Sequence, residues 1–503
     1  MRKIPSTMAT QHPDNAAAPF WDKDGNPFVS TQRELIDCMS TYRQLDMIEY
    51  MWDWEGKYAD ASIVDKLYGE SYDYFAEQPL GKDTFLTFRL PNIWEEKGYS
   101  LLQAMTVMLS AEDFAKDLGF KQRPLFEIIL PMTTRSDQLI QMHNLYSKLA
   151  QFKNDNFNTN NARNNEILEM IPLVEGVNSQ MSIGLLLQEY IDSYKAQYKV
   201  APSYMRPFIA CSDPALSSGW LSARLANLDA LSQIQQISDK TSIPMYPIIG
   251  VGGLPFRGGL TPNTAATFHE RYPGVRTVTI QSSFRFDYPI QQVKRSIKLL
   301  EQTLPHSKTR VLDDDTTKTV QALAIAAEQR YQTTLQGIAG DLQRVFAAVP
   351  RRRERRLHIG LLAYGRSSGT VKIPRAITYT AGLYSIGAPP EFIGLGRSLK
   401  AMSASELELL RNLNPHINEE IDTAGRYINI ANIEKLAKRN KAWSSVLDDI
   451  TYTQEILGIK LGPRTHAEKS HQNITSNVLL MKNNQKFLTR LIEETAILRK
   501  SLG

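Results

Sequence analysis

Several charged side chains stand at or directly after the ends of short apolar runs, and their types suggest a chemistry. Arg89, Glu175, Asp213 and Arg366 occupy such positions, and Arg375 follows nine residues after Arg366. Arginine stays charged and binds phosphate or carboxylate through a planar fork of donors. Paired carboxylates suit Mg²⁺ or Mn²⁺, which take oxygen ligands and retain water or substrate oxygens. Together these residues predict a polyanionic substrate that is held partly through a metal ion.

Two other segments contain residue types that could act on such a substrate. A glycine-rich segment at 250–259 places Gly258 and Gly259 directly after Arg257, and His12 precedes a proline near the start of the chain. The glycine segment lacks the ending of a Walker A loop and the spacing of a dinucleotide fingerprint, so a tight turn explains it equally well. On composition alone, a surface turn explains His12 better than catalysis does.

Each of these residues has a purely structural explanation when it is taken alone. A single arginine at a strand end forms a surface ion pair more often than it binds a ligand. A single carboxylate there is as suited to capping a helix as to binding metal. The argument for a site therefore depends on convergence, because seven of the eight apolar runs described next end in an ionisable or glycine-rich feature.

The elements that must position these residues are predicted to be eight strands. Each is a short apolar run, and the runs lie at 84–90, 124–132, 170–175, 205–213, 244–251, 278–284, 358–364 and 391–395. Stretches of helical period lie between most of them. This alternation predicts a parallel sheet, and eight repeats predict an α/β fold closed into a TIM-type (β/α)8 barrel, with an open doubly wound sheet as the alternative. The strand ends of such a barrel meet at one mouth.

The sequence predicts one elaborated barrel domain over residues 1–503. Residues 1–80 would form an N-terminal segment that carries His12, residues 81–400 the barrel, and residues 401–503 a helical segment packed on it. Ser403 and Glu406 form a capping box that begins the first helix of the last segment. No linker rich in glycine, serine or proline separates these parts, so the additional α-helices at both ends are expected to pack against the barrel.

Composition predicts a soluble, cytoplasmic protein. The 503 residues are 42% hydrophobic and 22% charged, which is ordinary for a globular chain. Two cysteines, Cys38 and Cys211, are too few for a disulfide framework and fit a reducing compartment. The first residues lack the apolar segment of a signal peptide, and no run of about 18 apolar residues predicts a membrane span.

A basic run, RRRERR at 351–356, makes nucleic-acid binding an alternative of a different class. The formal net charge of +5 is only a weak bias toward anionic ligands. No aromatic RNA-binding pattern, zinc-ligand spacing or helix-turn-helix signal accompanies the run. A solvated segment before a strand is the preferred interpretation, and no nucleic-acid partner is expected.

Four separated motifs carry a family resemblance. They read ATQHPDN at 9–15, IPLVE at 171–175, SDPAL at 212–216 and LPFRGGLTP at 254–262. In this order they resemble phosphoenolpyruvate carboxylase of the short archaeal type, which some bacteria also carry. The resemblance implies a TIM barrel, Mg²⁺ or Mn²⁺, and conversion of phosphoenolpyruvate and bicarbonate to oxaloacetate and phosphate through carboxyphosphate and an enolate. It also implies a cytosolic homotetramer that supplies four-carbon acids.

The resemblance assigns roles to residues at matching positions. Glu175 and Asp213 match the family's metal ligands, and His12, Arg257 and Arg366 are the expected catalytic residues. The expected substrate-binding residues are Arg89, Arg257, Gly258, Gly259, Gln281, Arg285, Arg366 and Arg375. A lid is expected to keep water from the reactive intermediate, and the loop at 252–260 is the candidate.

The chain departs from the longer bacterial and plant enzymes of this resemblance. It is much shorter, and its glycine-rich segment has a single arginine where theirs has two. The N-terminal serine segment that is phosphorylated in plants is not visible, so their allosteric control does not carry over. Another metal-dependent barrel lyase or mutase of pyruvate or phosphoenolpyruvate chemistry is the nearest alternative, and it predicts no dependence on bicarbonate.

Overall fold

A closed barrel of eight parallel strands forms the centre of the molecule. The computed structural model describes residues 2–95, 98–157, 168–354, 362–368, 371–481 and 484–503. The barrel strands are β1 (Thr7–Ala9), β2 (Glu49–Asp53), β3 (Phe85–Arg89), β4 (Glu127–Leu130), β5 (Glu169–Val174), β6 (Phe208–Ala210), β7 (Ile248–Gly250) and β8 (Thr277–Ile280). Each pairs with the next along the chain, and β8 returns to β1, where Thr7 pairs with Val278. The predicted TIM-type barrel is confirmed.

Six of the predicted runs, from 84–90 to 278–284, coincide with the barrel strands β3 to β8, although β5 and β8 each begin one residue before the predicted run. Apolar side chains from different strands meet inside the barrel and form one buried cluster. Its members are Met8, Met51, Ile129, Ile171, Leu173, Phe208, Ala210 and Ile248. The interior is therefore a packed core, as in other barrels of this type, and it leaves the strand ends as the place for a site.

The predicted barrel limits of 81–400 are wrong, because the strands run from Thr7 to Ile280. The first two strands lie in residues 1–80, which the sequence predicts to form an N-terminal segment outside the barrel. β1 has only three residues, and β2 reads Glu-Tyr-Met-Trp-Asp, with a charged residue at each end. Neither forms an apolar run long enough to be distinguished from its surroundings.

Two predicted strands do not belong to the barrel. The run at 391–395 spans the 3₁₀ turn η5 (Pro390–Phe392) and the start of α14 (Leu395–Ala401). Prolines at 389 and 390 lack the N–H groups that a central strand must donate. The run at 358–364 lies partly outside the described residues, and its last residues begin β9 (Leu362–Ser368), which pairs antiparallel with β10 (Val371–Pro374) in a separate sheet.

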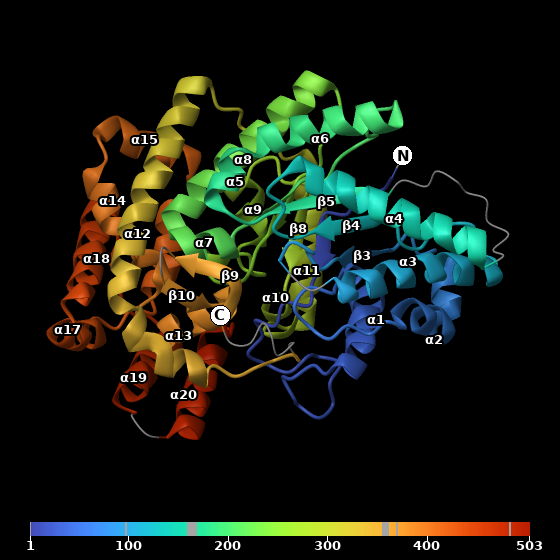
Figure 1. Ribbon diagram of the computed structural model, residues 1–503. Helices are drawn as coiled ribbons and strands as arrows, with labels where there is room; N and C mark the ends of the chain where they lie inside the picture. Colours follow the sequence, from blue (N-terminus) through green and yellow to red (C-terminus); the bar gives the residue numbers. More distant parts are fainter. Residues whose placement is uncertain (1, 96–97, 158–167, 355–361, 369–370, 482–483) are drawn as a thin grey trace.

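Helices cover the outside of the barrel (Figure 1). They are α1 (Glu34–Leu45), α2 (Ile63–Glu77), α3 (Tyr99–Asp117), α4 (Ser136–Asn156), α5 (Val177–Met181), α6 (Ile183–Tyr198), α7 (Ser212–Ser218), α8 (Trp220–Thr241), α9 (Phe268–Arg271), α10 (Ser282–Phe286) and α11 (Ile290–Thr303). The short helices α5, α7 and α10 begin within a few residues of the ends of β5, β6 and β8. Their first turns therefore stand at the mouth of the barrel.

The later helices gather on one side of the barrel (Figure 1). They are α12 (Asp314–Ala348), α13 (Ala376–Ser385), α14, α15 (Ala404–Leu413), α16 (Ile417–Gly425), α17 (Ile430–Arg439), α18 (Ser444–Leu457), α19 (His466–Leu480) and α20 (Gln485–Arg499). The predicted capping box of Ser403 and Glu406 is confirmed at the start of α15. A second buried apolar cluster joins these helices to α8 and includes Leu225, Leu335 and Ile421.

The carboxyl-terminal residues lie at the barrel mouth, against the segment that follows β1. After α20 the chain turns back, and Ser501, Leu502 and Gly503 are buried. The backbone N–H of Leu502 donates to the carbonyl oxygen of Asp14 at 2.7 Å.

Within the described residues, no helix combines the length and the apolar character that crossing a bilayer requires.

Candidate active site

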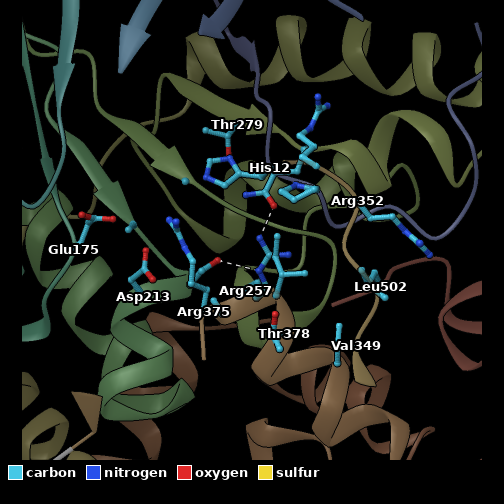
Figure 2. Close-up of a pocket in the computed structure, with 18 of the residues that line it drawn as sticks. His12, Glu175, Asp213, Arg257, Thr279, Val349, Arg352, Arg375, Thr378 and Leu502 are labelled. Atoms are coloured by element: carbon cyan, nitrogen blue, oxygen red, sulfur yellow. Dashed lines mark hydrogen bonds between the residues drawn. The ribbon is translucent and has the colours of Figure 1, made fainter. Parts of the chain in front are cut away.

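A cavity of about 250 Å³ opens at the carboxyl ends of the barrel strands (Figure 2). Among the described residues, its ionisable lining is dominated by arginine. The charged residues of the lining are Arg89, Arg257, Arg351, Arg352, Arg353, Arg375, Glu175 and Asp213. Six arginines against two carboxylates give the cavity an excess of positive charge, which favours a ligand with several negative charges.

Two carboxylates enter the cavity from neighbouring strands. Glu175 directly follows β5, and Asp213 lies in the first turn of α7 after β6. Oε2 of the buried Glu175 accepts the backbone N–H of Met132 at 2.8 Å, which fixes the direction of its carboxylate. Figure 2 shows both carboxylates on the same side of the cavity.

These two carboxylates fit a divalent cation that shares its remaining coordination positions with a ligand. Within the part of the chain that the structure describes, no group of three or more histidine, cysteine, aspartate or glutamate side chains could hold a metal ion. Mg²⁺ and Mn²⁺ sites often use only one or two protein carboxylates, and water or substrate oxygens complete the octahedron. Glu175 and Asp213 supply that oxygen chemistry.

Arg89 is fixed at the cavity wall by acidic partners on the neighbouring strand. Its guanidinium donates to both carboxylate oxygens of Asp53 at 2.9 and 2.7 Å and lies 3.0 Å from Glu55. Burial alone would lower the pKa of Arg89, but Asp53 and Glu55 raise it above its ordinary value. Arg89 therefore stays charged, and its orientation is set before any ligand binds.

The glycine-rich segment holds Arg257 in an otherwise crowded position. Arg257 ends the 3₁₀ turn η2 (Pro255–Arg257), and Gly258 follows with a φ of +105° that side chains rarely tolerate. A Cβ atom on Gly252 would stand 2.8 Å from the guanidinium carbon, so glycine there makes room for Arg257. The loop at 252–260, which is the predicted lid, is mostly buried. Hydrogen bonds within the loop fix its shape, including one from the N–H of Leu260 to the carbonyl oxygen of Gly252 at 3.0 Å.

The guanidinium of Arg257 joins parts of the chain that are far apart in sequence. Nε donates to Ser212 Oγ at 3.2 Å, Nη1 lies 3.1 Å from Asp14 Oδ2, and Nη2 donates to Gln281 Oε1. Nη1 also donates to the carbonyl oxygen of Gly503. Burial lowers the pKa of Arg257, and Asp14 opposes that shift.

His12 and Arg375 complete the polar lining. His12 follows β1, and its Nδ1 lies 2.9 Å from Thr10 Oγ1. Arg375 immediately precedes α13, and its guanidinium is 3.7 Å from Glu55 with 28% of the side chain exposed. Because its ion pair is longer and its side chain more accessible than those of Arg89, Arg375 is the arginine better suited to contact a ligand.

The structure brings most of the predicted site residues together. The residues that line the cavity are His12, Arg89, Glu175, Asp213, Arg257, Gln281 and Arg375. The predicted residues Gly258 and Gly259 are buried and shape the loop without lining the cavity. Arg366 lies in β9, but its side chain is outside the described part of the structure.

Arg285 does not take part in this cavity. Its side chain is 1% exposed, and Nη1 donates to Asp37 Oδ1 at 2.7 Å. Nη2 donates to the carbonyl oxygen of Thr10 at 2.9 Å. Arg285 therefore ties α10 to α1 and β1, which is a structural contact.

The basic run at 351–356 contributes residues that sequence reasoning missed. Its interpretation as a solvated segment is wrong for Arg352 and Arg353, which are 5% and 2% exposed. Arg353 pairs with Glu34 at 3.3 Å and Asp37 at 3.1 Å, whereas Arg351 is exposed and lines the cavity. Residues 355 and 356 are outside the described residues. The density of arginines in this short run was the feature of the sequence that could have indicated a role near the site.

Comparison with known proteins decides the family. A family model described as phosphoenolpyruvate carboxylase matches residues 4–503. The chain belongs to the phosphoenolpyruvate carboxylase family. A phosphoenolpyruvate carboxylase of Oenococcus oeni is 44% identical over 504 residues, covering 100% of this chain and 99% of the relative. One of Leuconostoc mesenteroides is 43% identical with the same coverage.

An archaeal member of the phosphoenolpyruvate carboxylase family also matches the whole chain. The phosphoenolpyruvate carboxylase of Metallosphaera sedula is 34% identical over 520 residues, covering 100% of both chains. This full-length match confirms the resemblance to the short archaeal type. Phosphoenolpyruvate carboxylases generally use a divalent metal, and the paired carboxylates Glu175 and Asp213 are the oxygen ligands such an ion prefers.

Proposed function

We propose that this protein carboxylates phosphoenolpyruvate with bicarbonate, giving oxaloacetate and phosphate. The observation that carries the proposal is one cavity in which two carboxylates, Glu175 and Asp213, face arginines from several separate elements. Phosphoenolpyruvate is a small polyanion with a phosphate and a carboxylate, which matches that lining. The product would supply four-carbon acids to the cell.

Glu175 and Asp213 would hold Mg²⁺ or Mn²⁺. Both are oxygen donors at one side of the cavity, and two protein ligands leave positions for substrate oxygens. The bound ion supplies Lewis-acid stabilisation of negative charge on the substrate oxygens. The remaining chemistry falls to the protein side chains.

Arg375, Arg89 and Arg257 would bind and orient the phosphate. In the first step a bicarbonate oxygen attacks phosphorus, and the bond from phosphorus to the enol oxygen breaks. Carboxyphosphate and the enolate of pyruvate result. Charge spreads over the phosphoryl oxygens during this transfer, and positioned guanidinium groups stabilise it. The side chain of Arg366 is proposed for the same group on the basis of the family resemblance.

His12 would act on the second step. Carboxyphosphate releases CO₂ and phosphate, and the methylene carbon of the enolate attacks CO₂ to form oxaloacetate. His12 would accept the proton of the carboxyphosphate carboxyl group, a role that its place in the cavity lining supports. Protonation of the enolate by water would instead convert the intermediate to pyruvate. The buried walls of the cavity would limit this loss because they keep water away from the enolate.

We further propose a cytoplasmic homotetramer that works without nucleic acid. The family resemblance supports the assembly and the compartment. The burial of Arg352 and Arg353 removes two charges from the basic run that suggested a nucleic-acid surface.

A coupled assay for oxaloacetate tests the proposed function. Turnover of phosphoenolpyruvate should require both bicarbonate and Mg²⁺ or Mn²⁺. Consumption of phosphoenolpyruvate without bicarbonate would favour a lyase or mutase of the same fold. Absence of turnover together with salt-sensitive binding of nucleic acid would favour the alternative that the protein binds nucleic acid.

A further inference from the structure

Asp14 occupies the point where three parts of the candidate site meet. Its side chain is 0% exposed and lies one residue after the His12-Pro13 pair. Oδ1 accepts the backbone N–H of Ser283 at 2.7 Å, and Oδ2 accepts Ser283 Oγ at 2.9 Å. Oδ2 also lies 3.1 Å from Nη1 of Arg257. Both oxygens of the carboxylate therefore have donors around them.

We infer that Asp14 is a positioning residue that holds His12, Arg257 and the segment ending at Gly503 in one catalytic arrangement. Asp14 does not line the cavity itself, so it would act through its neighbours. The inference rests on the proposed carboxylation, because it concerns how the enolate intermediate of that reaction is divided between oxaloacetate and pyruvate.

The orientation of Arg257 depends on Asp14 more than on its other partners. The other side chains that accept from Arg257 are neutral, a serine hydroxyl and a glutamine amide oxygen. Asp14 is the carboxylate with which Arg257 forms an ion pair in the described part of the chain. Hydrogen bonds between charged groups are the stronger and more directional ones. Loss of this charge would free the guanidinium to turn toward other acceptors, including the substrate in a different pose.

The position of His12 depends on the same network. Ser282 Oγ lies 2.5 Å from the carbonyl oxygen of His12 and accepts the N–H of Asp14 at 2.9 Å. Ser282 Oγ is also 3.1 Å from Asp14 Oδ1. Ser282, at the start of α10, thus binds the turn that carries His12 at two points, the carbonyl oxygen of His12 and the N–H of Asp14. A shift at Asp14 would move His12 with it.

The segment ending at Gly503 is tied to the same residue through the backbone. Leu502 N–H donates to the carbonyl oxygen of Asp14 at 2.7 Å, and Arg257 donates to the carbonyl oxygen of Gly503. His12, Arg257 and Leu502 line one cavity (Figure 2). Asp14 therefore couples a reactive histidine, a substrate-facing arginine and a wall of the cavity.

Asp14→Asn tests this inference because it keeps the shape and removes the charge. In either orientation the amide NH₂ group would face an N–H group, of Arg257 or of Ser283, that cannot accept from it, and only a serine hydroxyl would be left as its acceptor. We expect kcat for oxaloacetate to fall on the order of 100-fold, the loss that a misplacement of about 1 Å can cause. The share of phosphoenolpyruvate released as pyruvate should rise, because a misplaced His12 and Arg257 would let the enolate be protonated.

Asp287→Asn is the matched control. Asp287 is a half-buried carboxylate that also contacts the N-terminal segment, but its partners are the backbone N–H groups of Ala16 and Ala17. It should keep kcat within about twofold and leave the pyruvate share unchanged. A purely structural role of Asp14 predicts that Asp14→Asn loses melting temperature without a change in product ratio, and that result would overturn the inference.

Ser283→Ala provides a milder second variant if Asp14→Asn does not fold. It removes the Oγ donor to Asp14 and leaves the backbone N–H in place. The pyruvate share should rise in the same direction, by less, and an unchanged share would overturn the inference. Failure of the proposed function is visible separately, because the unmodified protein would then form no oxaloacetate with bicarbonate present.

Discussion

Asp213 stands at the start of α7 and faces the same cavity as Glu175. Asparagine has the same size but no charge, and a neutral amide oxygen is a weaker ligand for a hard divalent cation. We expect Asp213→Asn to lower kcat by at least about 100-fold, the upper range measured even for residues that only support metal ligands. Binding of Mn²⁺, measured by calorimetry without substrate, should weaken in parallel.

The control for this variant is Asp239→Asn. Asp239 is an exposed carboxylate near the end of α8, where it accepts from Gln235 at 2.7 Å. Kinetics and Mn²⁺ binding should stay within about twofold, as for most surface substitutions. Normal turnover of Asp213→Asn with native melting would remove Asp213 from the metal site.

Asp287 makes the stability of the protein depend on pH. Burial raises the pKa of this carboxyl from its ordinary value of 3.8 to about 8, although the N–H groups of Ala16 and Ala17 oppose the shift. Between these two values the folded protein keeps a proton that the unfolded chain has released. The free energy of unfolding contributed by this group is therefore present at low pH and lost as pH rises toward 8.

Asp287→Asn should remove that dependence, because the amide resembles the protonated acid. We expect the advantage of the variant over the unmodified protein to grow by about 1.4 kcal/mol per pH unit, to about 4 kcal/mol between pH 5 and pH 8. Urea unfolding at a series of pH values measures the difference. A constant difference across this range would show that Asp287 has no raised pKa in the folded state.

Gly503 lies in a position that no larger residue can occupy without movement. A Cβ atom there would stand 2.1 Å from the carbonyl oxygen of Ile377 and 2.8 Å from the backbone nitrogen of Ala381, both on α13. Because these neighbours are backbone atoms of a helix, the terminal segment must shift, and its bond to Arg257 shifts with it. We expect Gly503→Ala to lower kcat/KM by about tenfold to 100-fold.

Gly340→Ala is the control for this substitution. Gly340 lies in α12, and an added Cβ would meet nothing within 4 Å. Alanine in a helix interior should be neutral or stabilising by about 0.5–1 kcal/mol, with unchanged kinetics. Equal kinetics for both alanine variants would show that the segment ending at Gly503 does not support the site.

Sequence reasoning identified elements whose pattern is local and missed those defined by their partners. The runs that became β3 to β8 are apolar and flanked by helical periods. By contrast, β1 is three residues long and is a strand because β8 and β2 pair with it on either side. The site follows the same rule: Glu175 and Asp213 are marked by strand ends, whereas Gly503 enters only because the folded chain returns to Arg257.

At the scale of the whole molecule, buried ion pairs join the barrel to the later helices. Glu420 on α16 pairs with Arg224 on α8 and lies 3.3 Å from Arg271 on α9. All three residues are at most 2% exposed. Removing one partner of such a cluster leaves uncompensated buried charge, which is strongly destabilising.

Glu420→Gln should therefore lower the free energy of unfolding by about 3–5 kcal/mol. Glu419→Gln is the neighbouring control, because Glu419 pairs with Arg271 at 3.0 Å but is 53% exposed, and it should stay within about 0.5 kcal/mol. Denaturant unfolding followed by far-UV circular dichroism and by oxaloacetate formation measures both. A single shifted transition in both signals means that barrel and helices unfold together. If the helices alone unfolded first, activity would still disappear with them, because Arg257 takes its partners from the barrel and from the segment after α20.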